Sequence, residues 1–104
     1  MFSKGKHTGL TTKDITDIVP EIQILGHYFD IYKVPCVISS PLRTDKNPSL
    51  GLYSLDGHRI YYKDFSTKEY GDSFDLIAKY WGLSRDKVLE KINKEIILPN
   101  EKLK

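Results

Sequence analysis

Three side chains that could bind a nucleic acid stand at alternate positions in the middle of the chain: Arg59, Tyr61 and Lys63. Successive side chains of a β-strand point to opposite faces, so residues two apart share one face of the strand. Cations neutralise phosphates, and aromatic rings stack on exposed bases. A strand face with these residues meets the physical needs of single-stranded nucleic-acid binding. The alternative interpretation is that these residues form only the solvated face of an antiparallel sheet, which alternation always produces.

Two lysines in the neighbouring segments, Lys46 and Lys68, extend this predicted binding track. The chain of 104 residues carries 16 Lys and Arg against 14 Asp and Glu, so its net charge is only +2. From residue 33 to residue 68 there are six cations and three anions, and the basic character is therefore local. Any phosphate binding is expected to depend on this central stretch. For Lys46 the alternative is a structural turn, because Asn47 and Pro48 follow it directly.

Patterns typical of catalysis or metal binding are weaker. The three histidines have no metal-ligand spacing, at His7, His27 and His58. Cys36 is the only cysteine, which excludes an intrachain disulfide and a cysteine-based zinc cluster. Asp72 and Asp75 have a spacing that could suit a metal pair, although Asp72 is better explained as a helix cap. No phosphate-binding glycine loop and no nucleophile with its base are present. We therefore expect a non-enzymatic module without a cofactor, and a small nuclease that uses Asp residues is a rival.

A β-hairpin is expected to position this strand face. Residues 50–53 form a short apolar run, Asp56-Gly57 is a strong signal for a hairpin turn, and residues 58–65 form the returning strand. On the returning strand Ile60 and Tyr62 have the opposite parity to the cations, so they are expected to face the core. The hairpin thus separates a core face from a basic and aromatic face.

Short helices are expected before and after the hairpin. Residues 11–32 are predicted to form two helices, the first with an apolar stripe of Ile15, Ile18 and Val19. A further helix is predicted at residues 73–81, capped by Asp72 or Ser73, and another begins after Ser84. Residues 33–39 alternate as a strand does, and Pro35 restricts that strand to a sheet edge.

These elements predict an α+β domain, in which a small antiparallel sheet is flanked by N-terminal and C-terminal helices. The domain is expected to span residues 11–98, between a tail at residues 1–10 and a frayed end at residues 99–104. The tail carries positive charge, so a basic arm that contacts phosphate is the alternative to a loose terminus. The sequence has no apolar run long enough to cross a membrane and no secretory signal pattern, and the lone cysteine suits a reducing compartment. We therefore expect a cytoplasmic protein.

Three segments of the chain resemble a known family. Residues 40–49 are SPLRTDKNPS, residues 62–72 are YKDFSTKEYGD, and residues 81–92 are WGLSRDKVLEKI. They resemble the zinc-binding domain at the N-terminus of bacterial and phage DNA primases. That family begins its core with C-P-x-H-x-E-K-x-P-S and continues, after a hairpin, with Y-H-C-x-x-C-x-x-G-G-D. The resemblance covers residues 38–92 and implies a zinc-ribbon-like sheet.

All four metal-ligand positions of that family are replaced in this chain, by Ser40, Arg43, Asp64 and Thr67. Structural zinc is held by thiolates and imidazoles in a tetrahedral set, and a guanidinium would repel the ion. We therefore expect no structural zinc. Zinc contributes folding free energy in such domains. Our hypothesis is that Arg43 and Asp64 form a hydrogen-bonded ion pair in its place, with additional core from the flanking helices.

The resemblance also implies a function in DNA replication, because primases of this family present the sheet face to the single-stranded template. We expect a non-catalytic, template-binding accessory module of a phage-type or mobile-element primase. The expected partners are single-stranded DNA and a primase catalytic domain or replicative helicase. The alternative is a protein-interaction module that docks a helicase, a polymerase or a host factor. Phosphate binding weakens steeply with salt, whereas apolar docking does not, so salt distinguishes the two.

Replacement of Arg43 tests the ion-pair hypothesis. The Arg43→Ala protein is expected to unfold more easily than the parent, because Asp64 would lose its charge partner. The measurement is the free energy of unfolding in urea. An Arg43→Ala protein as stable as the parent would contradict the ion pair.

Overall fold

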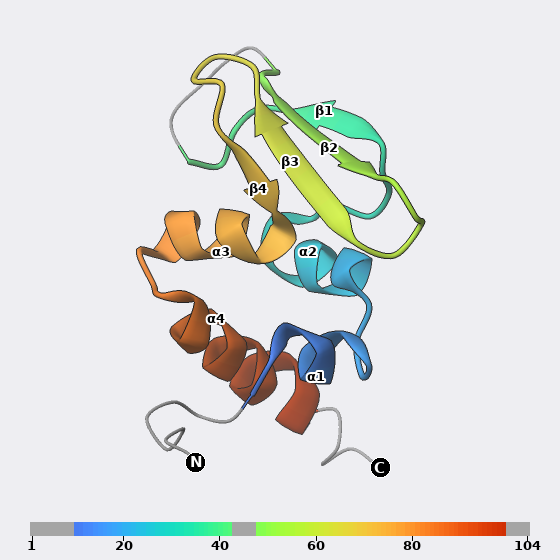
Figure 1. Cartoon of the computed structure of the whole chain (residues 1–104), viewed down its shortest axis with the longest axis vertical. Coiled ribbons are helices and arrows are strands. Elements are labelled where there is room, and N and C mark those ends of the chain that lie inside the picture. Colours follow the sequence, from blue (N-terminus) through green and yellow to red (C-terminus); the bar gives the residue numbers. More distant parts are fainter. Residues whose placement is uncertain (1–9, 43–47, 100–104) are drawn as a thin grey trace.

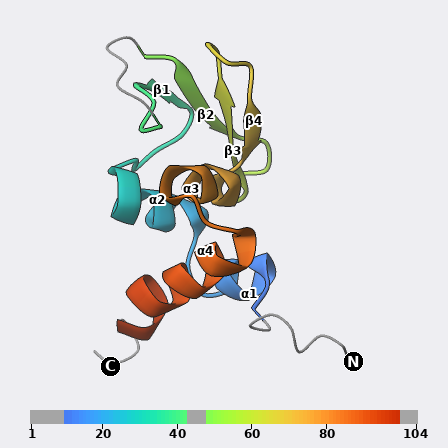
Figure 2. The same cartoon turned by 90° about the vertical axis from the view of Figure 1, so that its left-hand side faces the viewer.

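A four-stranded antiparallel sheet forms one end of the molecule, and two layers of helices lie beneath it (Figures 1 and 2). The computed structural model describes residues 10–42 and 48–99. The strands follow chain order across the sheet: β1 (Cys36–Ile38), β2 (Leu50–Ser54), β3 (Ile60–Asp64) and β4 (Tyr70–Asp72). The expected α+β class, with a small antiparallel sheet flanked by helices, is confirmed. None of the helices in the described part of the chain has the length and apolar content that a bilayer crossing requires.

The predicted hairpin is formed by β2 and β3, although β3 is shorter than the expected residues 58–65. The register pairs Leu52 with Tyr62. In the turn, the Asp56 carboxylate accepts hydrogen bonds from the backbone N–H groups of His58 and Arg59, both at 2.8 Å. These N–H groups are therefore satisfied by the turn instead of the strand ladder, and β3 begins only at the next residue.

Both edge strands are three residues long. The predicted strand at residues 33–39 is limited to β1, which lies at the sheet edge as expected and pairs Val37 with Gly51. Strand β4 was not predicted, because residues 66–72 show no apolar alternation. It forms because β3 offers a free edge, to which it pairs through Lys63 and Tyr70.

The helices are α1 (Thr12–Thr16), α2 (Glu21–Phe29), α3 (Ser73–Trp81), α4 (Arg85–Ile92) and the π-helical η2 (Asn93–Ile97). The side-chain oxygens of three residues cap α1, α3 and α4 by accepting hydrogen bonds from backbone N–H groups: Thr11, Asp72 and Ser84. Asp72, not Ser73, is therefore the cap of α3. The predicted apolar stripe of α1 is wrong at Ile18, which is 62% exposed. The reason is that α1 ends at Thr16, so Ile18 no longer follows helical spacing.

Two hydrophobic clusters hold the three layers together. The first lies between the sheet and the α2–α3 layer and includes Leu25, Leu50, Leu52, Ile60, Tyr62 and Leu76. The second lies between that layer and α1, α4 and η2, and includes Ile15, Ile24, Phe74, Ile77, Val88 and Ile92. Helices α2 and α3 contribute neighbouring residues to different clusters, because successive positions of a helix point to different sides. Ile60 and Tyr62 face the core, as predicted.

The Tyr62 hydroxyl is buried without a hydrogen-bond partner among the described residues. The residue has no exposed surface, and burial raises the pKa of its phenol above the usual value. An unpaired buried polar atom lowers stability, because it loses its hydrogen bonds to water without replacement.

Removal of this hydroxyl is therefore expected to stabilise the fold. Tyr62→Phe keeps the ring and should raise the free energy of unfolding by about 1 kcal/mol, measured by chemical denaturation. Leu76→Ala, in the same cluster, is the contrasting control and should lower it by about 2–5 kcal/mol. A Tyr62→Phe protein that is clearly less stable than the parent would contradict the unpaired hydroxyl.

Candidate nucleic-acid interface

The sheet face that points away from the helices carries two rows of side chains. One row consists of Val37, Gly51, Lys63 and Tyr70, and the other of Tyr53, Tyr61 and Asp72. The opposite parity on β2 and β3 is buried against the helices. The strand register thus places tyrosines and a lysine from three strands next to one another.

Five side chains define the aromatic face: Tyr53, Tyr61, Lys63, Phe65 and Tyr70. The Tyr53 and Tyr61 rings are cross-strand neighbours with centroids 5.8 Å apart. Tyr70 is 72% exposed and Phe65 is 49% exposed. Lys63 is exposed and forms no ion pair with any described residue. Rings that stay exposed on an open sheet offer surfaces on which bases can stack, and the lysine offers a positive charge between them.

Two hollows flank Tyr53 on this face. The β1-side hollow, of about 340 Å³, is lined by Val37, Gly51, Lys63 and Phe65 among others. The β4-side hollow, of about 350 Å³, is lined by Tyr53, Tyr61, Tyr70, Gly71, Asp72 and Asp75. Gly51 matters for the first hollow, because a Cβ atom there would lie 2.9 Å from Cζ of Phe65. The Phe65 ring therefore covers a position that has no side chain.

Arg59 lies at the margin of the aromatic face, inside an ion-pair network. Its Nε lies 2.6 Å from Oε2 of Glu21, without the alignment of a hydrogen bond, and its Nη2 donates to Oδ2 of Asp72 at 2.7 Å. Arg85 donates to the same Asp72 oxygen at 2.7 Å and to Oδ1 of Asp75 at 2.9 Å. Two guanidinium groups thus meet three carboxylates. The network has a net negative charge and does not favour phosphate.

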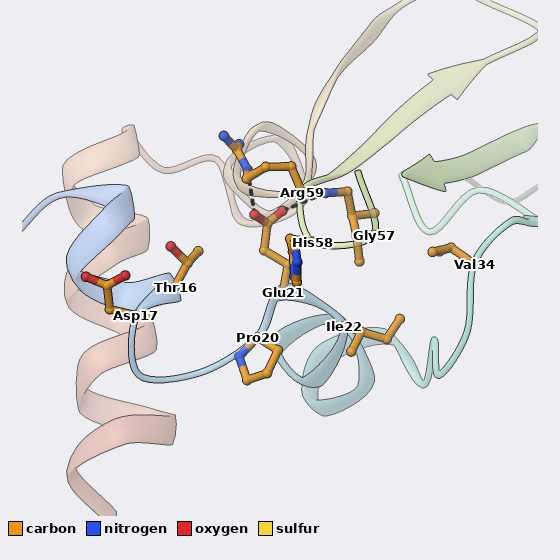
Figure 3. Close-up of a pocket in the computed structure, with 10 residues that line it drawn as sticks. Thr16, Asp17, Pro20, Glu21, Ile22, Val34, Gly57, His58 and Arg59 are labelled. Atoms are coloured by element: carbon orange, nitrogen blue, oxygen red, sulfur yellow. Dashed lines mark hydrogen bonds and ion pairs between the residues drawn. The ribbon is translucent and has the colours of Figure 1, made fainter. Parts of the chain in front are cut away.

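Glu21 lies in the wall of a cleft of about 560 Å³ that is lined by residues of α1, α2 and the β2–β3 turn (Figure 3). Figure 3 shows its carboxylate pointing toward Arg59. Glu21 is only 2% exposed, and its Oε1 accepts hydrogen bonds from the Ile60 backbone N–H at 3.0 Å and the Ser73 hydroxyl at 2.6 Å. These contacts join α2 to β3 and α3, which is a structural role.

The Asp72 carboxylate stays ionised despite its burial. Its side chain is 12% exposed, and burial alone would raise its pKa. Hydrogen bonds from Arg85 and from the Asp75 backbone N–H, with the charges of Arg85 and Arg59, outweigh that effect. Together they hold the pKa of Asp72 below its ordinary value.

Of the four positions that the predicted resemblance matches to zinc ligands, three lie within the described residues: Ser40, Asp64 and Thr67. Ser40 is buried, and its hydroxyl oxygen accepts the backbone N–H of the residue two positions later at 3.1 Å. Asp64 is fully buried, and its Oδ1 accepts the backbone N–H groups of Ser66 at 2.9 Å and Thr67 at 3.1 Å. Arg43 lies outside the described residues, so its ion pair with Asp64 stays a prediction. The described part of the chain contains no group of three His, Cys, Asp or Glu side chains suited to a metal.

The predicted binding residues are distributed unevenly. Tyr61 and Lys63 lie together on the aromatic face, and the Arg59 guanidinium lies 5.8 Å from the Tyr61 ring centroid while it pairs with carboxylates. Lys68 is exposed in the β3–β4 turn, with a positive φ of 71°. Lys46 lies outside the described residues.

Three aromatic members of the face were not predicted as binding residues: Tyr53, Phe65 and Tyr70. The hairpin signal at Asp56-Gly57 could have placed Tyr53 opposite Tyr61, and Phe65 shares the parity of Lys63. Tyr70 had no such signal, because β4 itself was not predicted.

No protein-family model matches the chain, and no curated protein or solved structure matches it significantly. The resemblance to the primase zinc-binding domain therefore stays a prediction. Functional conclusions rest on the aromatic face.

The charge on Asp72 is expected to make stability depend on pH. Its folded-state pKa is depressed, so its contribution is complete above the unfolded pKa of about 3.9 and is lost as the pH falls through the folded value. Asp72→Asn should lower the free energy of unfolding at pH 7 by about 1–3 kcal/mol, and the difference from the parent should shrink below about pH 4. The measurement is urea denaturation across a pH series.

The matched control is Asp86→Asn, which alters an exposed carboxylate in the first turn of α4 and should change stability little. A parent–Asp72→Asn difference that stays constant down to pH 2 would contradict the role of this charge.

Proposed function

We propose that this chain binds single-stranded DNA through its aromatic face, as the template-binding accessory module of a phage-type or mobile-element DNA primase. The observation that carries this proposal is the gathering of Tyr53, Tyr61, Phe65 and Tyr70 around the exposed Lys63 on an open sheet face. Base stacking on an aromatic ring is worth about 1–3 kcal/mol per base and does not depend on base identity. A duplex hides its base faces, so a surface of this kind favours single strands.

The lysines on and beside the aromatic face are the residues that would bind phosphate. Lys63 stands between Gly51 and Tyr70 in the register, and the Phe65 ring lies over the Gly51 position. Lys68 lies in the turn that follows β3. Arg59 contributes less than its sequence position suggests, because its charge is offset by Glu21 and Asp72.

The primase part of the proposal rests on the resemblance of residues 38–92 and on two local features that are compatible with it. The hairpin turn between β2 and β3 falls between the first two of the three resembling segments, which is compatible with the hairpin of that family. The turn at Asp64–Thr67, which the resemblance would match to the second pair of metal positions, is closed by two backbone N–H groups that donate to the Asp64 carboxylate. A side chain that accepts two backbone N–H groups can stabilise such a turn without zinc.

A protein-interaction module is the second candidate, and one observation favours it. Among the described residues that line the β1-side hollow, Lys63 alone is charged. This hollow lies beside the edge strand β1, which has one unpaired edge in the described sheet. An apolar side chain of a replication protein could fill it.

Fluorescence anisotropy with labelled single-stranded and duplex DNA tests the proposal. We expect preference for single strands and salt-sensitive binding. Two or three phosphate contacts would give a slope of log K against log salt of about −1.4 to −2.1. The Tyr61→Ala/Lys63→Ala protein should lose about 2–4 kcal/mol of binding free energy, from one stacking contact and one phosphate contact.

The matched control removes the same residue types elsewhere. Tyr32 is 71% exposed and packs against Gly26 of α2, and Lys87 lies on α4, so Tyr32→Ala/Lys87→Ala should bind like the parent. Absence of binding by the parent at low salt would refute the proposal. Salt-insensitive capture of a replication protein on the β1-side hollow would favour the second candidate.

A further inference from the structure

The β4-side hollow combines aromatic walls with a carboxylate. Tyr53, Tyr61 and Tyr70 supply the rings, and Gly71 and the two aspartates complete the lining. Three rings around one hollow are suited to hold the flat faces of a base. The carboxylates can then meet the polar edge of that base, which a ring cannot read.

Asp75 is the carboxylate that can reach a ligand. Its Oδ2 accepts the Asp72 backbone N–H at 3.0 Å, and its Oδ1 accepts from Arg85 at 2.9 Å. Each carboxylate oxygen has two lone pairs, so each can accept a second hydrogen bond. The Asp75 side chain is 49% exposed, whereas that of Asp72 is 12% exposed. The Asp75 carboxylate is therefore accessible, and it accepts only two of the four hydrogen bonds that its oxygens can accept.

The position of Asp75 is held before any ligand arrives. It is the third residue of α3 and closes the capping box with Asp72. It also lies directly against Gly71, where a Cβ atom would come within 2.6 Å of Oδ2. A group fixed in this way binds without first losing conformational freedom.

Charge determines how a strand would lie on the face. The network of Arg59, Arg85, Glu21, Asp72 and Asp75 has one more carboxylate than guanidinium groups, so it repels phosphate. Lys63, whose charge no described residue pairs, attracts it. The backbone is therefore expected near Lys63, with the edge of a base directed toward Asp75.

We propose that the β4-side hollow is a base-selective subsite that favours cytosine or adenine over thymine or uracil, with Asp75 as the specificity-determining residue. Cytosine and adenine carry an exocyclic amino group that donates to a carboxylate, and aspartate is a known acceptor for the cytosine N4 amino group. Thymine and uracil carry a carbonyl oxygen at the corresponding position, and two acceptors repel one another. This inference rests on the proposed function, because it needs single-stranded nucleic acid on the aromatic face.

Two pairs of oligonucleotides test the inference, because in each pair one member has the exocyclic amino group and the other lacks it. Anisotropy is measured with oligo-dC and oligo-dU of one length, and with oligo-dA against the same oligomer of purine deoxyriboside, which lacks the 6-amino group. The parent protein should bind oligo-dC and oligo-dA about fivefold more tightly than their partners. In Asp75→Asn the side chain can both donate and accept, so the ratio should fall to within about twofold.

Phe65→Ala is the matched control, because Phe65 lines only the β1-side hollow of the two. It should weaken binding to every oligonucleotide equally and leave the ratios unchanged. If Asp75→Asn does not fold, the adenine–purine comparison on the parent protein decides the question. Equal binding of all four oligonucleotides would overturn the base selectivity while the proposed function stands. No binding of any of them would overturn both.

Discussion

Glu21 opens α2 with a carboxylate that is almost fully buried, and its oxygens reach three partners on other elements. It accepts the first backbone N–H of β3 and the hydroxyl of Ser73 at the start of α3, and it pairs with Arg59. A buried carboxylate is tolerated only when it is paired and hydrogen-bonded, and loss of its partner would cost about 3–5 kcal/mol. Through Arg59 the contact continues to Asp72 and Arg85, so the sheet, the middle helices and α4 share one network. The orientation of the sheet on its helices depends on this network.

The same network determines how much positive charge the aromatic face carries. Arg59 pairs with the carboxylates of Glu21 and Asp72 at the sheet margin, so it contributes little net charge to the aromatic face. The face therefore depends on exposed rings and on Lys63, which suits a ligand held chiefly by stacking. Because the carboxylates of Asp72 and Asp75 stand at one end and Lys63 in the middle, the face is electrostatically asymmetric. A single-stranded nucleic acid that binds there is expected to lie with its phosphates near Lys63 and away from the two carboxylates.

Carboxylate side chains accept backbone hydrogen bonds at both ends of strand β3. At its start Glu21 accepts the backbone N–H of Ile60, and at its end Asp64 closes the following turn through two backbone N–H groups. Between these ends the strand buries Ile60 and Tyr62 against α2 and α3. The second cluster, below those helices, adds further apolar burial to the fold. These contacts and clusters are formed by the chain's own side chains among the described residues.

The sequence alone determined the elements whose signals are local. The helix start at Ser84, the Asp56-Gly57 turn and the core-facing parity of Tyr62 depend on neighbours within a few positions. Only the tertiary structure decided which distant groups meet. Strand β4 forms because a free sheet edge is available, and Arg59 lies at the margin of the aromatic face because it pairs there with Glu21, a buried residue 38 positions earlier. Pairings of that kind depend on how layers pack, and no local pattern records them.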